Sequence, residues 1–411
     1  MTRGSCVATV LVLFLSSEVQ AQVNPDHTFS VREENGIRIT ESTGGPKYSG
    51  EIFRYEQILI LQGDPTKPES LIGQAVATSL LGEDGAIYIW DSRPTRIIHF
   101  SADGTYLNDI GRMGQGPGEY EIPHLLSVTD NAVTISDPSR GRNSIFRPDG
   151  SLIETITLHA ARRFQYAWPR PDGGFLLIPF PTLRTVENHR DESLLVTIIG
   201  DELDTLNTVE IGPVQGPYVS ERGYIIWRVF NGSPSVAIHP ERGIYTTTGI
   251  ESTITVRDYS GRIVQIIEAG IPPEPVSRQE RRTVRAALRL MADEAPSERW
   301  RARARVALDH DVFCDPKAFW DELMVDENGY LWASLPYDTF NFFDPDRSGA
   351  NKGLFRVFSP EGEYLGITKV PAPGSFSRGH FIALQEDTET WDINVVLYRI
   401  EPAVAGFRFP E

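Results

Sequence analysis

The chain has 411 residues, 40% of them hydrophobic, and its 39 Lys and Arg residues against 56 Asp and Glu residues give a net charge of −17. This charge excludes nucleic acid as a partner, because affinity for a phosphate backbone depends on clustered lysines and arginines, and it makes the chain as a whole a poor ligand for anionic lipid surfaces. Length alone allows two or three domains, and the hydrophobic content is sufficient for a large core.

The first residues have the pattern of a secretory signal peptide. A single Arg3 precedes an apolar run from Val7 to Leu15, and a polar stretch then ends at Ala21. The apolar run is about half as long as the roughly 20 residues that a membrane-spanning helix needs. We therefore expect residues 1–21 to be removed on export to the periplasm or the extracellular space, and residues 22–411 to form one domain.

Turns in which Gly follows an acidic residue or Asn recur along the chain, and short runs of alternating or β-branched residues flank them. These turns lie at Asp84-Gly85, Asp103-Gly104, Asp149-Gly150, Asp172-Gly173, Asn328-Gly329 and Glu361-Gly362. Asp and Asn tolerate a left-handed backbone and Gly adopts it freely, so the turns are typical of β-hairpins. Gly85 and Gly104 are about 19 residues apart, and Gly104 and Gly150 about 46. This spacing fits two hairpins in each four-stranded blade of a β-propeller.

The spacing predicts five blades at about residues 77–123, 124–163, 164–212, 234–273 and 319–371. A sixth blade is only partly filled by strands at His380–Leu384 and Asn394–Ile400. We expect N-terminal strands at Ile37–Thr40 and Ile52–Leu61 to complete that sheet, because a closed ring leaves few exposed sheet edges. The prediction is thus an all-β, six-bladed propeller of four-stranded antiparallel blades. Seven blades are the alternative, if residues 213–234 contain further strands.

Residues 275–310 depart from the strand pattern and predict two short helices inserted between blades four and five. Ser277 is a candidate N-cap, Val284, Leu288 and Met291 recur at helical spacing, and Pro296 starts a second helix. The insertion holds nine arginines: Arg278, Arg281, Arg282, Arg285, Arg289, Arg299, Arg301, Arg303 and Arg305. We expect a solvated helix face whose apolar side docks on the propeller. A docking site for an acidic partner or ligand is the alternative.

Two stretches resemble the blade signatures of NHL-repeat and TolB-like bacterial six-bladed propellers. The first, Ile110–Pro123, is a Gly-rich link that ends in an aromatic residue and Pro, and the second, Val325–Trp332, is similar to a blade opening of that family. The resemblance covers about Ile37 to Ile400. It departs at the inserted helices and at residues 129–131, where Thr-Asp-Asn replaces the usual Gly turn. Members of the family include binding proteins, lactonase-like hydrolases and lyases, so the resemblance implies the fold but no single activity.

No motif in the chain specifies a cofactor or metal. The glycines of residues 111–118 are followed by Pro and a strand, whereas a phosphate-binding loop needs a following helix. Asp344–Gly349 is similar to the opening of a calcium loop, but Phe355 occupies the position of the closing Glu. The eight His residues show no metal-ligand spacing. We therefore expect no cofactor and no metal, with a calcium ion at that loop as the alternative.

The candidate ligand-binding residues follow from propeller geometry. The first strand of each blade lines the central channel, and the loops that enter these strands form one face, where ligands commonly bind. On the predicted register these entries carry His124, Tyr166, Trp168, Trp227, Arg228, Trp320, Asp321, Arg378 and His380. Aromatic and cationic groups that converge on a channel mouth suit a polar organic ligand or a peptide carboxylate. Alternatively, the same residues pack in the channel or lie at its rim without binding a ligand.

The sequence thus predicts an exported, monomeric propeller that binds a polar small molecule, a peptide or a protein partner at its channel mouth, without assigned catalysis. The alternative is a metal-assisted hydrolase of lactonase type, or a lyase. In that case Asp321 and Glu51, with His124 or His380, would hold a divalent cation that activates water.

Overall fold

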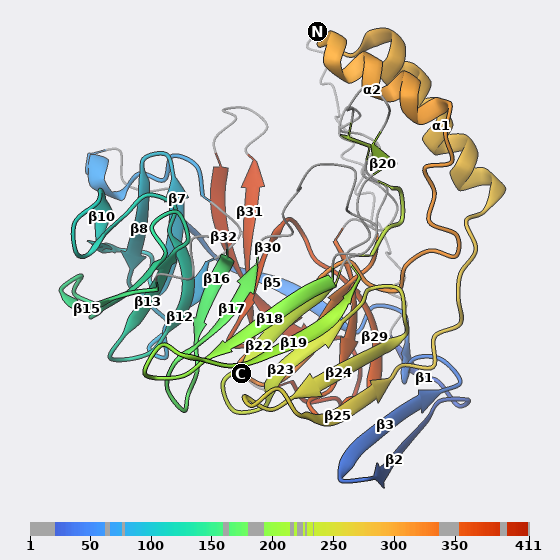
Figure 1. Cartoon of the computed structure of the whole chain (residues 1–411), viewed down its shortest axis with the longest axis horizontal. Coiled ribbons are helices and arrows are strands. Elements are labelled where there is room, and N and C mark those ends of the chain that lie inside the picture. Colours follow the sequence, from blue (N-terminus) through green and yellow to red (C-terminus); the bar gives the residue numbers. More distant parts are fainter. Residues whose placement is uncertain are drawn as a thin grey trace, which may run out of the picture.

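The structure, a computed structural model, describes residues 21–61, 66–75, 79–158, 164–179, 193–213, 218–219, 225–226, 228–232, 234–336, 353–386 and 393–409. Six sheets lie around a central axis, each with four antiparallel strands from one blade (Figure 1). The prediction of an all-β, six-bladed propeller is confirmed. Apart from Ala21, the expected signal peptide lies outside the described residues.

The strands of each blade run in order from the channel outward. Blade one holds β6 (Leu80–Leu81), β7 (Ile87–Ser92), β8 (Thr95–Phe100) and β9 (Tyr106–Ile110), and blade two holds β12 (His124–Val128), β13 (Val133–Asp137), β14 (Arg142–Phe146) and β15 (Leu152–Thr157). Blade three holds β16 (Phe164–Pro169), β17 (Phe175–Pro179), β18 (Ser193–Ile199) and β19 (Thr205–Pro213). Blade four holds β22 (Ser235–His239), β23 (Gly243–Thr247), β24 (Thr253–Arg257) and β25 (Ile263–Glu268).

Blade five holds β26 (Leu323–Val325), β27 (Leu331–Ser334), β28 (Leu354–Phe358) and β29 (Tyr364–Lys369). Blade six holds β30 (Gly374–Ser377), β31 (His380–Glu386), β32 (Ile393–Pro402) and β5 (Phe53–Leu61). Three short pairs lie outside the blades: β1 (Gln22–Val23) with β4 (Tyr48–Ser49), β10 (Arg112–Met113) with β11 (Glu119–Tyr120), and β20 (Tyr218–Val219) with β21 (Ile225–Ile226). A 3₁₀ turn, η1 (Pro68–Ser70), precedes blade one.

Blade six combines the two ends of the chain. Strand β5 pairs antiparallel with β32, in a register that runs from Leu61 opposite Val395 to Phe53 opposite Pro402. The predicted place of Ile37–Thr40 in the same sheet is wrong. Strand β3 (Ile37–Thr43) instead pairs parallel with β25, and its hairpin partner β2 (Thr28–Glu34) extends blade four to six strands. The short strand β30, which was not predicted, already fills the inner position of blade six, while β3 covers the outer edge of blade four.

Aromatic side chains pack between neighbouring blades. The ring of Trp332 in blade five stacks on Phe376 in blade six, with ring centroids 3.9 Å apart and an interplanar angle of 14°. Between blades one and two, Tyr120 donates its hydroxyl to the Ile110 carbonyl and accepts the Ile97 amide. Gly111 crosses this junction at φ 67°, where a Cβ atom would lie 2.8 Å from the Tyr120 ring. The Gly-rich link therefore allows two blades to approach closely.

The two ends of the propeller differ. At one end, here called the turn end, short hairpins join the first and second strands of each blade, such as the Asp84-Gly85 turn between β6 and β7. At the other end, called the entry end, the chain enters each first strand, and the long connection between blades four and five lies here. The helices α1 (Arg278–Glu294) and α2 (Glu298–Leu308) emerge here between blades four and five, which confirms the predicted insertion.

The inserted helices form a hairpin that stands away from the sheets (Figure 1). Ser277 caps α1 in a capping box, because its hydroxyl accepts the Glu280 amide and the Glu280 carboxylate accepts the Ser277 amide. The buried side chains of both helices pack with Val229 and Phe313 of the flanking segments and not on the blades. Neither helix of the described chain is long and apolar enough to cross a membrane.

Candidate functional site

Two of the predicted binding residues meet at the entry end. His124 begins β12, and its ring lies edge-on to Tyr166 of β16, with centroids 4.9 Å apart. On its other side His124 contacts Trp90 of β7, at 5.0 Å. Trp90 was not predicted because it lies on a second strand, where its ring is on the face of β7 that packs against blade two. Trp168, farther along β16, packs against the core between blades three and four.

His124 is held in its neutral form. Burial lowers the pKa of its imidazole to about 4, although the carboxylate of Asp137 acts in the opposite direction. The His124 Nδ1 and the Trp90 Nε1 atoms are buried without a hydrogen-bond partner among the described residues. A buried polar atom without a partner costs about 1–3 kcal/mol. This half-buried cluster of rings therefore carries unused hydrogen-bonding capacity.

The predicted binding residues Trp320 and Asp321 are adjacent in the sequence but have different surroundings. Trp320 is 0% exposed in the core between blades four and five, where its Nε1 atom donates to the Glu251 carbonyl at 2.8 Å. Its expected position at an open mouth is wrong, because the ring forms part of the core. Burial raises the pKa of the Asp321 carboxyl group. The adjacent Glu322 is exposed by surface area, yet desolvation by surrounding protein, and to a lesser extent the Asp321 carboxylate, raise its pKa.

Arg378 and His380 lie at the turn end, opposite the end where they were predicted. Arg378 occupies the turn between β30 and β31 at φ 47°, and its side chain donates to the carbonyls of Leu81 and Val128. Its amide donates to the Glu327 carboxylate at 2.7 Å, and its carbonyl lies 2.8 Å from the His380 Nδ1 atom. Arg378 therefore connects blades one, two, five and six. The error arose because β30 was not recognised and the following turn was taken for a strand entry.

No metal centre forms among those remaining candidates that the structure describes. Trp227 and the calcium-like loop Asp344–Gly349 lie outside the described residues, and Arg228 is an exposed residue that contacts the thiol of Cys314. Glu51 lies beside the outer strand of blade five, so it does not join Asp321, His124 and His380 in the expected set of cation ligands. Within the described ranges no three His, Cys, Asp or Glu side chains gather closely enough to hold a metal ion.

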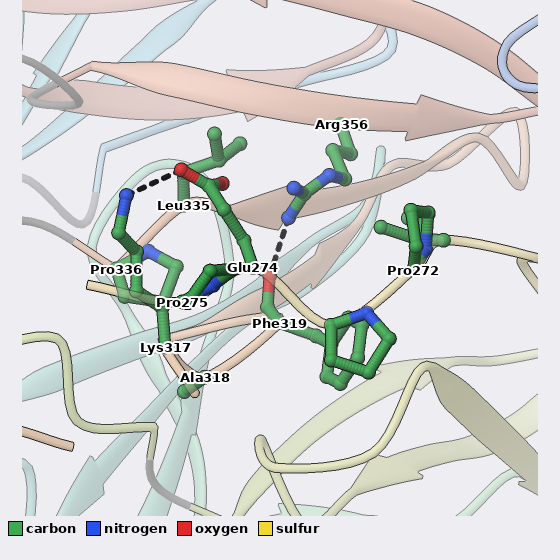
Figure 2. Close-up of a pocket in the computed structure, with 11 residues that line it drawn as sticks. Pro272, Glu274, Pro275, Lys317, Ala318, Phe319, Leu335, Pro336 and Arg356 are labelled. Atoms are coloured by element: carbon green, nitrogen blue, oxygen red, sulfur yellow. Dashed lines mark hydrogen bonds and ion pairs between the residues drawn. The ribbon is translucent and has the colours of Figure 1, made fainter. Parts of the chain in front are cut away.

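A pocket with a cavity volume of about 240 Å³ opens at the entry end between blades four and five (Figure 2). Its walls come from the two connections of the helical hairpin and from strand ends of blade five: Ile271, Pro272, Pro273, Glu274, Pro275, Lys317, Ala318, Phe319, Leu335, Pro336 and Arg356. Most of these side chains are apolar. No pattern in the sequence predicts this pocket, although the proline-rich run at residues 271–275 forms one of its walls.

The two cations of the pocket differ in their partners. The ammonium group of Lys317 bonds to the carboxylates of Glu274 and Glu280 and is 8% exposed. Burial lowers the pKa of Lys317, but these hydrogen bonds outweigh it and raise the pKa overall. The guanidinium of Arg356 donates to the Phe319 carbonyl at 2.5 Å and lies 5.5 Å from the ring centroid of Trp320. No carboxylate of the described residues forms an ion pair with Arg356, so its guanidinium is the cation of the pocket that no direct ion pair neutralises.

Comparisons with known proteins agree with the fold. A family model described as a 6-bladed beta-propeller matches residues 65–161, less than half of the chain. No curated protein matches the chain. The resemblance to NHL-repeat and TolB-like propellers stays a prediction, because the matched family is described only by its blade number.

The chain is also similar to several solved structures at low sequence identity. A protein from Bacteroides fragilis that is described as exported is 12% identical, with a TM-score of 0.47, and the match covers 85% of this chain and 95% of that one. A member of the DUF4221 family from Bacteroides vulgatus is 13% identical, with a TM-score of 0.45 and coverages of 86% and 99%. The calcium-binding protein regucalcin from Agrobacterium tumefaciens is 10% identical, with a TM-score of 0.38 and coverages of 88% and 98%.

Proposed function

We propose that this propeller is a binding protein whose ligand, a small organic anion with a carboxylate and an apolar group, enters the pocket between blades four and five. The observation that carries the proposal is Arg356. Its guanidinium lines the pocket without a carboxylate partner among the described residues, and its hydrogen bond to Phe319 fixes its position. A guanidinium binds a carboxylate through paired N–H donors, which adds geometric specificity to charge.

The apolar walls favour an organic anion over an inorganic one. Pro272, Pro275, Phe319 and Pro336 line the pocket with rigid, weakly polar surface (Figure 2). Ligand pockets commonly combine such walls with a few fixed polar groups. Lys317 adds no free positive charge, because the carboxylates of Glu274 and Glu280 together exceed its single charge. The expected ligand therefore places one carboxylate on Arg356 and a flat or aliphatic group against the prolines.

Benzoate and its neutral isostere benzamide test this proposal in a ligand-observed NMR titration. Wild-type protein should bind benzoate at millimolar concentration and benzamide at least ten times more weakly, because a charge-assisted hydrogen bond contributes about 1.5–3 kcal/mol. Arg356→Gln should reduce benzoate binding by a similar factor. Arg112→Gln is the matched control and should bind benzoate as wild type does. Arg112 lies on the link after blade one, and its side chain is 80% exposed.

Thermal unfolding of each variant shows whether Arg356→Gln still folds. Equal binding of benzoate and benzamide, or unchanged benzoate binding in folded Arg356→Gln, would refute the assignment. We also propose export, on the pattern of residues 3–21. Mass spectrometry of protein recovered outside the cytoplasm should then find a mature chain that begins at Gln22.

A further inference from the structure

A stripe of arginines runs along α1. Arg278, Arg282, Arg285 and Arg289 are spaced by four, three and four residues, so they lie on one side of the helix. With a rise of about 1.5 Å per residue, the stripe is about 16 Å long. It flanks the face that buries Val284 and Leu288, so it borders the packed side of the hairpin without being part of it.

The stripe has few partners in the protein itself. Arg285 donates to the Leu308 carbonyl at the end of α2. Arg278, Arg282 and Arg289 are exposed, and no carboxylate of the described chain pairs with them. Other arginines of the insertion do have partners: Arg281 with Asp311 and Asp315, and both Arg301 and Arg305 with Glu298.

The arrangement of charge is unfavourable for the helix alone. Like charges three or four residues apart destabilise a helix by about 0.2–0.5 kcal/mol per pair, and the stripe contains three such pairs. Arginines near the N-terminus and Asp293 and Glu294 at the C-terminus also oppose the helix dipole. Helix stability therefore does not explain the stripe.

The hairpin and the propeller carry opposite charge. Residues 278–308 contain nine arginines against the four acids Glu280, Asp293, Glu294 and Glu298, a net charge of +5 within a chain of net charge −17. Figure 1 shows this basic hairpin standing away from the acidic blades. A narrow acidic segment could lie along the stripe without approaching the blades. A broad anionic surface such as a bilayer would also face the acidic remainder of the protein, which it repels.

We propose that the α1 stripe is a docking site for an acidic peptide segment of a partner protein. The segment places carboxylates opposite Arg278, Arg282 and Arg289 over about 16 Å, the length of about five extended residues. None of the stripe arginines lines the pocket around Arg356, although Glu280 of the same helix binds the pocket residue Lys317.

A fluorescently labelled 12-residue poly-glutamate peptide is the probe, and binding is measured by anisotropy with the full-length chain. Wild-type protein should bind at 150 mM NaCl, and binding should weaken as salt increases. Arg278→Gln, Arg282→Gln and Arg289→Gln together should weaken binding at least tenfold. The matched control changes three exposed arginines on the blades and links, Arg112→Gln, Arg147→Gln and Arg262→Gln, which removes the same total charge. It should stay within twofold of wild type.

Equal weakening in both triple variants would refute the docking site, because net charge alone would then explain binding. Absence of binding at 50 mM NaCl would also refute it. Two further measurements distinguish other occupants. If the protein binds vesicles with 30% phosphatidylglycerol but not the peptide, the proposal is overturned in favour of a lipid surface. If sedimentation velocity shows self-association that the α1 triple variant abolishes, the proposal is overturned in favour of a second copy of this chain. Circular dichroism confirms that α1 remains helical in each variant.

Discussion

His124 should make the stability of the propeller depend on pH. Its pKa is lowered to about 4 by burial between the rings of Trp90 and Tyr166, whereas an unfolded His titrates near 6.5. The folded pKa is the lower one, so the neutral imidazole contributes stability above about pH 6.5. That contribution is lost as the pH falls toward 4. With these two values, the loss between pH 8 and pH 5 is about 2 kcal/mol.

The measurement is urea unfolding of wild type and His124→Phe at pH 8 and pH 5. Phe keeps a ring between Trp90 and Tyr166 but cannot take up a proton. From pH 8 to pH 5 the free energy of unfolding should therefore fall by about 2 kcal/mol more in wild type than in the variant. Comparing the two proteins removes the contributions of other titrating groups. Arg112→Gln is a control in which the pH dependence should stay as in wild type. A difference of less than 0.5 kcal/mol between the two pH dependences would refute the buried, neutral state of His124.

Three further predictions concern the core and the turn end. Trp320→Ala should lower the free energy of unfolding by about 3–5 kcal/mol, because it empties a fully buried site, and a urea-unfolding loss below 1 kcal/mol would contradict its core role. Arg378→Ala should be less stable than Arg378→Gly by about 1 kcal/mol, since φ 47° suits Gly; equal thermal stabilities would contradict this. Burial raises the pKa of Asp326 to about 7, because it outweighs the hydrogen bonds that the carboxylate accepts. As the pH rises from 4 to 7, the free energy of unfolding of wild type should therefore fall relative to that of Asp326→Asn. Parallel pH profiles of the two proteins would exclude that titration.

The blade count could be predicted because most of the hairpin turns carry their own local signal. Asp84-Gly85 and Asn328-Gly329 adopt the left-handed glycine conformation that their sequences predict. Ser277 likewise forms the predicted cap, and α1 buries the predicted Val284. These features depend on a few neighbouring residues, so the sequence is sufficient to locate them.

The sites could not be located in the same way, because they depend on which segments lie side by side. The four residues of β30 gave no strand signal, so Arg378 was assigned to the wrong end of the channel. Trp90 contacts His124 from the second strand of the neighbouring blade. Arg356 and the proline run at residues 271–275 are far apart in the chain and meet only across the junction of blades four and five. Spacing within a blade carries no information on such contacts.

A crystal structure of the protein with bound benzoate would test the proposed function most directly. The proposal predicts the carboxylate within hydrogen-bonding distance of the Arg356 guanidinium, with the ring against Pro272 and Phe319. Benzoate bound elsewhere in the protein, with the pocket between blades four and five unoccupied, would contradict the proposal.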